Sequence, residues 1–351
     1  MSNTPDKVLI LGCGTIGQIK ARLWLSLGVT VYLHDTNPAR VDRLLAEIDG
    51  LIRLKDNTDG FIVDISTPSD QHASSLSWVF ENIPHPKMIL IEKPICTNSR
   101  DKARINQLLR DHRHVPVYVN ESYFWSSALN WLLNRLQDGN EKITSVKVNL
   151  SKNRLADAAT GRFFDKELEA YGIEVPHVLA VLQKLGFGKL DVVESTIYRE
   201  KDNFINQGVH IALTDTNNRL IIIDSFLGDF IVQSEGVAQN ALMRQIVITT
   251  DSGSYYHISF DPAPNEPRFK SVITVNNTER VVLEDDHLRK HLEHVRTNSV
   301  DAAMKHFLSP ANSMKIYDFL DTLYCSKVEK EYIPDDVVNY DNEVGEKAGV
   351  I

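Results

Sequence analysis

Short apolar runs alternate with amphipathic stretches through the first 120 residues of the chain. A short apolar run flanked by turn-forming residues is typical of a buried strand, whereas helical spacing of apolar residues marks the stretches between. The expected strands are residues 7–11, 29–33, 60–65, 88–91 and 115–119, and the expected helices are residues 15–27, 38–48, 69–80 and 99–112. Residues 51–58 are polar, so we expect at most a stunted strand there. Strands that alternate with helices predict a parallel sheet covered on both faces.

The pattern changes after about residue 123 and becomes mainly one of alternating polar and apolar positions separated by turns. The expected strands are residues 145–150, 191–198, 209–214, 219–224, 229–233, 245–250, 255–260, 268–275 and 279–283. Helices are expected at residues 176–185, 286–296 and 311–327, with a charged, peripheral tail from residue 329. The alternation predicts a mostly antiparallel sheet with one face left to helices or to a partner.

The chain has 351 residues, enough for about two domains at the usual ~100–200 residues each. The predicted fold class is α/β, with a doubly wound parallel sheet of the Rossmann type over residues 1–122. An α+β domain with an open, mostly antiparallel sheet and C-terminal helices is predicted for residues 123–351.

The net charge, the N-terminal sequence and the spacing of cysteines and histidines limit the partners, the compartment and the metals that we expect. The formal net charge is −9 and no basic tract is present, which argues against nucleic acid or an anionic membrane as a partner. The N-terminus has no secretory pattern, and no apolar stretch reaches the ~18 residues of a membrane span. Three widely spaced cysteines suit a reducing cytoplasm, and the twelve histidines form no cluster with metal-ligand spacing. We expect a cytoplasmic protein without a metal.

A glycine-rich loop follows the first expected strand directly. The sequence Gly12-Cys13-Gly14-Thr15-Ile16-Gly17 opens the first helix, the setting in which a GxGxxG fingerprint binds a dinucleotide. The first glycine allows the tight turn, the second lets the backbone approach a pyrophosphate, and the third brings helix and strand together. Asp35 ends the second strand with Thr36 beside it, where a carboxylate accepts the ribose hydroxyls of NAD and repels the 2′-phosphate of NADP. We therefore expect NAD rather than NADP, with a turn-forming role for Asp35 as the alternative.

Two further motifs follow, in an order that carries a resemblance. Residues 65–72 read Ile-Ser-Thr-Pro-Ser-Asp-Gln-His at the end of one strand, and Glu92-Lys93-Pro94 ends the next. With the glycine loop and the Ser-Pro-Ala-Asn stretch at 309–312, this order resembles the glucose–fructose oxidoreductase/inositol dehydrogenase (Gfo/Idh/MocA) family over roughly residues 6–332. The resemblance implies a Rossmann domain that carries NAD(P), a sheet domain, a small polyhydroxylated substrate between them, and a homodimer or homotetramer.

The resemblance also implies roles for residues at the strand ends. Lys93 would bridge the cofactor and the substrate hydroxyl, because a cation held there favours a developing alkoxide. The remaining residues expected at the cofactor are Ser66, Thr67, Pro68, His72, Glu92 and Asn120, although His72 would serve equally well as a cap or packing residue.

His177 is the expected general base. Family members often place an aspartate four residues before this histidine, but Ile173 stands there, and Glu174 is one possible replacement. Pro176 indicates that the helix begins near it, so the helix dipole would favour a neutral His177 imidazole. Four further residues are candidates for substrate binding: Tyr123, Arg162, Asp165 and Tyr171.

These residues predict an NAD-dependent oxidoreductase acting on a secondary hydroxyl of a sugar, sugar derivative or cyclitol. Lys93 and His177 would handle the hydroxyl proton. Two alternatives remain open: a glycoside hydrolase that uses NAD transiently, and a non-catalytic NAD-sensing regulator on the same fold.

Overall fold

The chain divides into two compact units, each with its own sheet. The computed structural model describes residues 6–55, 59–159, 164–201, 203–228, 242–297 and 300–331. The first unit contains residues 1–124 and 288–318, and the second contains residues 125–287 and 319–351. The first unit is interrupted after residue 124, two residues beyond the domain boundary expected after residue 122. Because we expected one boundary only, the return of residues 288–318 to the first unit was not predicted.

The first unit contains a six-stranded parallel sheet in the order β3-β2-β1-β4-β5-β6. Its strands are β1 (Lys7–Leu11), β2 (Thr30–His34), β3 (Leu51–Arg53), β4 (Phe61–Ile65), β5 (Met88–Glu92) and β6 (Val117–Asn120). Strand β3 has only three residues, so the expected stunted strand is confirmed. All five residues of β4 are buried, as a central strand covered on both faces requires. The strand order reverses beside β1, which creates the switch point where ligands bind to open α/β sheets.

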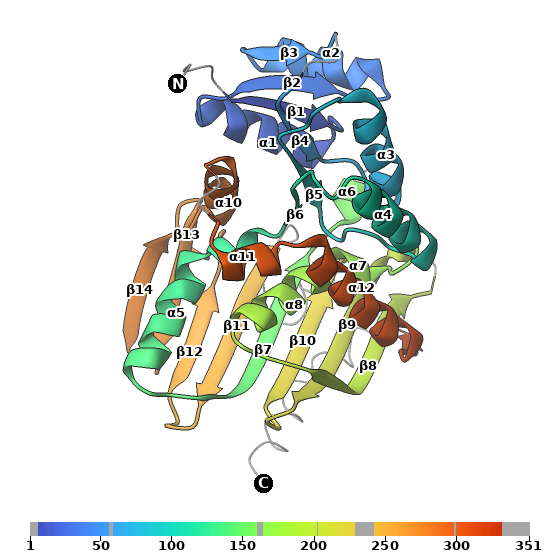
Figure 1. The fold of residues 1–351 in the computed structure, drawn as a ribbon. Helices are drawn as coiled ribbons and strands as arrows, with labels where there is room; N and C mark the ends of the chain where they lie inside the picture. Colours follow the sequence, from blue (N-terminus) through green and yellow to red (C-terminus); the bar gives the residue numbers. More distant parts are fainter. Residues whose placement is uncertain are drawn as a thin grey trace. The chain divides into compact units, whose positions relative to one another are not determined.

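Helices connect these strands. They are α1 (Thr15–Ser26), α2 (Pro38–Glu47), α3 (His72–Asn82) and α4 (Ser99–Asp111), with short 3-10 turns η1 (Ser69–Gln71) and η2 (Ser122–Trp125). The Asn37 side chain caps α2 by accepting from the Ala39 N–H, and Pro38 occupies the first turn where it is favoured. Helices α3 and α4 lie side by side (Figure 1).

The returning C-terminal segment completes the first unit. It contains α10 (His287–Arg296), α11 (Ala302–Phe307) and the first part of α12 (Pro310–Cys325). The Val119 N–H in β6 donates to the Leu308 carbonyl at 2.8 Å, and the Phe124 and Phe307 rings stack with centroids 4.8 Å apart. The edge strand of the first sheet is therefore held by residues that occur some 190 positions later.

The second unit contains a nine-stranded sheet in the order β14-β13-β12-β11-β7-β10-β9-β8-β15. Only the β7–β10 and β8–β15 pairs are parallel. The strands are β7 (Ile143–Lys152), β8 (Leu190–Glu200), β9 (Asn203–Asp215), β10 (Leu220–Phe226), β11 (Leu242–Thr250), β12 (Tyr255–Ser259), β13 (Lys270–Val275), β14 (Glu279–Glu284) and β15 (Val328–Glu331).

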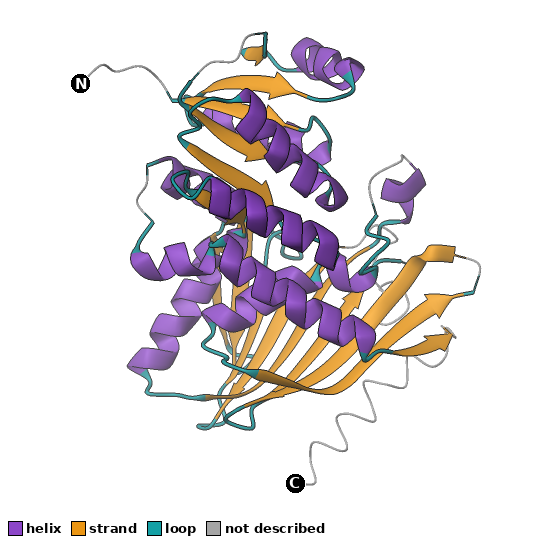
Figure 2. Ribbon diagram, turned by 45° about the vertical axis from the view of Figure 1, so that its right-hand side comes forward, coloured by secondary structure: helices purple, strands orange, loops and turns teal. Residues whose placement is uncertain are grey.

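The second unit contains the helices α5 (Ser127–Asp138), α6 (Leu155–Ala159), α7 (Ala170–Ile173) and α8 (Val175–Lys184). Helix α5 lies against β13 and β14, and α8 lies against β7 and β10 on the same face (Figures 1 and 2). Along β7 and β10, the alternate residues Val146, Val148, Ile221 and Ile223 are buried, so they form the core beneath α8.

The predicted fold class is confirmed in both units. The tail expected from residue 329 begins as a strand that was not expected, because Val328–Glu331 forms the exposed edge strand β15 of the second sheet. The expected strand at 229–233 lies outside the described residues.

Candidate functional site

The carboxyl ends of the parallel strands in the first unit bring the predicted motifs to one edge of the sheet (Figure 1). Strand β1 leads into the glycine loop, and β2 leads into Asp35. Strand β4 leads into Ser66, β5 ends with Glu92, and β6 ends with Asn120. Because these strands are parallel neighbours, residues from five separate stretches of sequence share this edge.

The glycine loop has little room for side chains at two positions. Gly12 has a φ of +101°, and a Cβ there would lie 2.8 Å from the Thr67 nitrogen. A Cβ on Gly17 would lie 2.0 Å from the Gly12 carbonyl oxygen. The loop after β1 therefore packs directly on the loop after β4, and helix α1 packs directly on the loop that precedes it.

Gly14 differs from the other two glycines. It is the N-cap of α1, no side chain caps the helix there, and a Cβ at Gly14 would meet no described heavy atom within 4 Å. An uncapped helix N-terminus with an open approach to its backbone is the arrangement that accepts a phosphate group.

Asp35 is tied to the backbone of its surroundings. Its carboxylate accepts the Cys13 N–H at 2.7 Å and the Asn37 N–H at 2.8 Å. Arg40 Nη1 lies 4.0 Å from Asp35 Oδ2, and the Arg40 side chain is half exposed. Burial, and then the Asp35 carboxylate, raises the pKa of the Cys13 thiol to about 12. Cys13 is thus a neutral packing residue at neutral pH, while Asp35 fixes the glycine loop.

His72 links the loops after β4 and β5. Its imidazole is completely buried, with Nε2 3.1 Å from the Thr67 carbonyl oxygen and Nδ1 3.2 Å from the Ile95 carbonyl oxygen. Burial lowers the pKa of His72, so the ring is neutral near pH 7. These contacts support the packing interpretation of His72, and its contact with a cofactor stays a prediction.

Lys93 directly follows β5 and is half-buried. The Lys93–Pro94 peptide bond is cis. Its place at the carboxyl edge, immediately after a buried strand, is the one expected for a lysine that acts on a ligand there.

A buried charge cluster lies beneath this edge, and the sequence analysis missed it. Lys20 in α1 is completely buried, and its Nζ donates to Asp64 Oδ1 in β4 at 2.8 Å and pairs with the Glu92 carboxylate. Trp24 Nε1 donates to the other Asp64 oxygen at 2.9 Å. Burial acts to lower the pKa of Lys20, but the Asp64 and Glu92 carboxylates outweigh it and leave that pKa above its usual value. Lys20 is therefore a cation in the core.

Asn120 extends the cluster to the returning C-terminal segment. Its Nδ2 donates to Asp64 Oδ1 at 3.1 Å, and its Oδ1 lies 2.9 Å from Nε2 of the buried His291 in α10. The side chain of Asn120 is thus engaged at both ends inside the first unit, and its contact with a cofactor stays a prediction.

His177 lies in the first turn of α8, as predicted from Pro176. The backbone N–H of His177 donates to the Glu174 carbonyl oxygen at 3.0 Å. The buried Glu174 carboxylate accepts from Arg154 Nη2 at 3.1 Å, so it has a cationic partner within the second unit. Roles for His177 as a base and for Glu174 at a substrate stay predictions.

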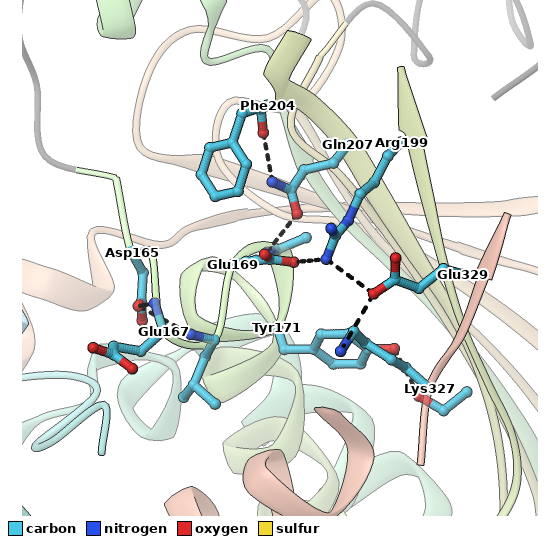
Figure 3. A network of polar contacts seen from close by, with 12 residues as sticks. Asp165, Glu167, Glu169, Tyr171, Arg199, Phe204, Gln207, Lys327 and Glu329 are labelled. Carbon is cyan, nitrogen blue, oxygen red and sulfur yellow. Dashed lines mark hydrogen bonds and ion pairs between the residues drawn. The ribbon is translucent and has the colours of Figure 1, made fainter. Parts of the chain in front are cut away.

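Two of the residues predicted to bind substrate are enclosed in the second unit (Figure 3). The Asp165 carboxylate accepts the N–H groups of Glu167 and Leu168 at 2.9 and 3.1 Å, which fixes a turn. The Tyr171 hydroxyl lies 2.7 Å from Ser195 Oγ, and burial raises the pKa of Tyr171 to about 12. Both side chains are at most 1% exposed, which supports a structural role; their contact with substrate stays a prediction.

Three predicted site residues remain to be placed. Tyr123 is buried in the first unit, Thr36 lies in the turn between β2 and α2, and Arg162 lies outside the described residues. Within the described ranges, no group of three or more His, Cys, Asp or Glu side chains is arranged to hold a metal ion. None of the described helices combines the length and the hydropathy that a membrane crossing needs.

Solved structures with a fold similar to that of this chain are known. No family model and no curated protein matches the chain. Among solved structures, it is similar to KijD10, a 3-ketoreductase from Actinomadura kijaniata, in complex with TDP-benzene and NADP, with a TM-score of 0.71 and 14% identity over 94% of this chain and 100% of the other. It is also similar to the UDP-N-acetylglucosamine 3-dehydrogenase GnnA from Acidithiobacillus ferrooxidans, with a TM-score of 0.62 and 14% identity over 92% and 98% of the two chains. The chain therefore has the two-part fold of these enzymes, a Rossmann unit with a mixed, mostly antiparallel sheet unit.

Proposed function

We propose that this protein is a nicotinamide-dependent oxidoreductase that interconverts a secondary hydroxyl and a ketone on a sugar, sugar derivative or cyclitol. The observation that carries the proposal is the position of Lys93, which follows β5 at the same sheet edge as the glycine loop. The similarity to a 3-ketoreductase and a sugar-nucleotide 3-dehydrogenase supports it, and adds nucleotide-linked sugars to the substrates to be tested.

The residues present fit a dinucleotide. The open backbone at Gly14 and the α1 N-terminus suit the pyrophosphate, and Asp35 stands where the adenosine ribose would be recognised. A bound nicotinamide would exchange a hydride with the carbon that bears the hydroxyl. The Lys93 ammonium donates to the substrate oxygen and gives it a proton when a ketone is reduced, and the neutral Lys93 amine takes the proton when an alcohol is oxidised. His177, at the start of α8 in the second unit, is our candidate for the second proton-transfer group.

We propose that NAD is preferred over NADP, because a carboxylate at Asp35 repels a 2′-phosphate. The opposing features are the exposed Arg40 guanidinium beside Asp35 and the NADP bound to KijD10. Titration of both oxidised cofactors with the purified protein decides this point, and tighter binding of NADP would refute the preference.

The activity test uses the full chain with NAD or NADP and a panel of polyols, cyclitols, free sugars and nucleoside-diphosphate sugars. Formation of reduced cofactor, followed by absorbance, supports the proposal. Release of an aglycone without net cofactor reduction would support the hydrolase instead. Cofactor binding without turnover of any class would support the regulator and overturn the proposal.

A further inference from the structure

The buried cluster below the sheet edge contains unequal numbers of charges. Lys20 supplies one positive charge, and Asp64 and Glu92 each supply one negative charge. The core of the first unit therefore holds one excess negative charge at the carboxyl ends of β4 and β5. Unbalanced charge in a low-dielectric interior is costly, which makes it a strong indication that something balances it.

The excess charge is located on Glu92. Asp64 is completely buried and accepts three donors, Lys20 Nζ, Trp24 Nε1 and Asn120 Nδ2. Glu92 pairs with the same Lys20 ammonium and keeps 15% of its side chain exposed. The charge of Glu92 also acts on His72, whose pKa is lowered by burial, so His72 adds no positive charge near pH 7.

Lys93 follows Glu92 directly and is the titratable group that changes charge in the proposed reaction. When Lys93 is protonated, the four side chains together are neutral. When Lys93 has given its proton to the oxygen of a ketone substrate, they carry one negative charge. At that stage the nicotinamide ring is oxidised and carries a formal positive charge, whereas the reduced ring carries none.

We infer that Glu92, held by Lys20, is the counter-charge for the oxidised nicotinamide, so that the reactive edge is neutral on both sides of the reaction. This inference rests on the proposed function. Lys20 is the positioning residue, because its ammonium fixes one side of the Glu92 carboxylate. Without the charge on Glu92, the edge would be more positive by one charge at each stage, and the oxidised ring, which is itself positive, would bind less favourably relative to the reduced ring.

The test measures binding rather than turnover. Dissociation constants of the oxidised and reduced forms of the preferred cofactor are determined for the wild type and for Glu92→Gln, which removes the charge and keeps the shape. A unit charge acting across roughly 10 Å at an effective dielectric constant of about 20 changes a binding ratio on the order of tenfold. We expect the oxidised form to weaken by about that factor relative to the reduced form. The matched control is Glu81→Gln near the C-terminal end of α3, the end that leads to the start of β5 and not to its carboxyl end, where the ratio should not change.

A second variant guards against misfolding. Lys20→Gln/Asp64→Asn/Glu92→Gln removes all three charges of the cluster, so it has the same net charge as Glu92→Gln, and replacement of a whole buried charge cluster is far better tolerated than loss of one partner. It should show the same loss of preference for the oxidised form as Glu92→Gln. An unchanged ratio in whichever of these variants folds, with both cofactor forms still bound, overturns the inference and leaves the proposed function standing. Failure of the wild type to bind either form overturns the proposed function itself.

Discussion

Gly14 and Gly17 are three residues apart in the same loop, yet alanine at each should have a different effect. At Gly17, an added Cβ would lie 2.0 Å from the Gly12 carbonyl oxygen, whereas real Cβ atoms essentially never come within 3.0 Å of a neighbour. The obstructing atom belongs to the backbone, so a rotamer change cannot relieve the overlap. Such overpacking costs up to about 3 kcal/mol, and the better helix propensity of alanine recovers about 1 kcal/mol. Gly17→Ala should therefore destabilise the protein by about 2 kcal/mol.

At Gly14, the added Cβ would meet no described heavy atom within 4 Å, and the φ of −75° suits alanine. The loss of a glycine N-cap costs less than about 1 kcal/mol. The methyl group would, however, stand where a pyrophosphate must approach the backbone. Gly14→Ala should keep its stability and bind NAD(P) at least tenfold more weakly, on the order expected for a lost phosphate contact of about 1.4 kcal/mol.

Thermal unfolding without cofactor and calorimetric titration with cofactor separate the two effects. The Gly17→Ala midpoint should fall by about 4–8 °C, given about 2–4 °C per kcal/mol for a protein of this size class. Gly188→Ala is the control, since a Cβ at Gly188 also meets no described heavy atom within 4 Å but this residue lies in the second unit. A Gly17→Ala protein as stable as the wild type, or a Gly14→Ala protein that binds cofactor normally, would refute the reasoning.

Three further substitutions test the remaining roles. Asp35→Asn keeps an acceptor for one backbone N–H but removes the negative charge. In parallel titrations, NADP binding should therefore improve relative to NAD binding. An unchanged ratio of the two dissociation constants would exclude charge repulsion at this position. Lys93→Met should leave cofactor binding nearly intact and lower turnover by a factor on the order of 10², and normal turnover would remove Lys93 from the mechanism. His177→Ala should abolish most turnover and alter its pH profile, whereas Glu174→Gln should mainly lower stability, by about 1–3 kcal/mol, because it leaves Arg154 with a weaker acceptor. Full activity of His177→Ala with an unchanged pH profile would contradict the role of His177. A loss of turnover in Glu174→Gln without a loss of stability would contradict the structural role of Glu174.

The alternation of strands and helices in the first unit and the glycine loop could be predicted because each rests on local signals. The buried strand at residues 7–11 and the glycine spacing after it are recorded in consecutive residues. Helix α8 likewise begins at Pro176 and its neighbour, as the proline indicates. These features depend on backbone chemistry that a short stretch of sequence specifies.

The charge cluster could not be read in the same way, because its members are 44 and 28 positions apart along the chain. A signal was nevertheless present. Asp64 interrupts an otherwise apolar buried strand, and Lys20 and Trp24 are four residues apart, so they share one face of a helix. An acidic residue in a central strand needs a donor. The Lys20 ammonium and the Trp24 indole N–H, on the buried face of α1, are the donors to Asp64.

The role of the C-terminal segment was missed for a different reason. The sequence predicts α10 and α12 as helices, but periodicity does not say which sheet a helix joins. Pairing of the Leu308 carbonyl with β6 and of His291 with Asn120 depends on long-range packing. The strand β15 was missed because four exposed residues give no apolar pattern.

The return of residues 288–318 to the first unit has a consequence for synthesis on the ribosome. The 163 residues from 125 to 287 must be translated before α10 and Leu308 can reach β6. At ~5–20 residues per second, this takes roughly ten to thirty seconds. During that interval the edge of β6 lacks its partner, and Asn120 lacks His291. We therefore expect the nascent first unit to expose this strand edge until then, and a stop codon before residue 288 removes part of the first unit as well as the end of the second.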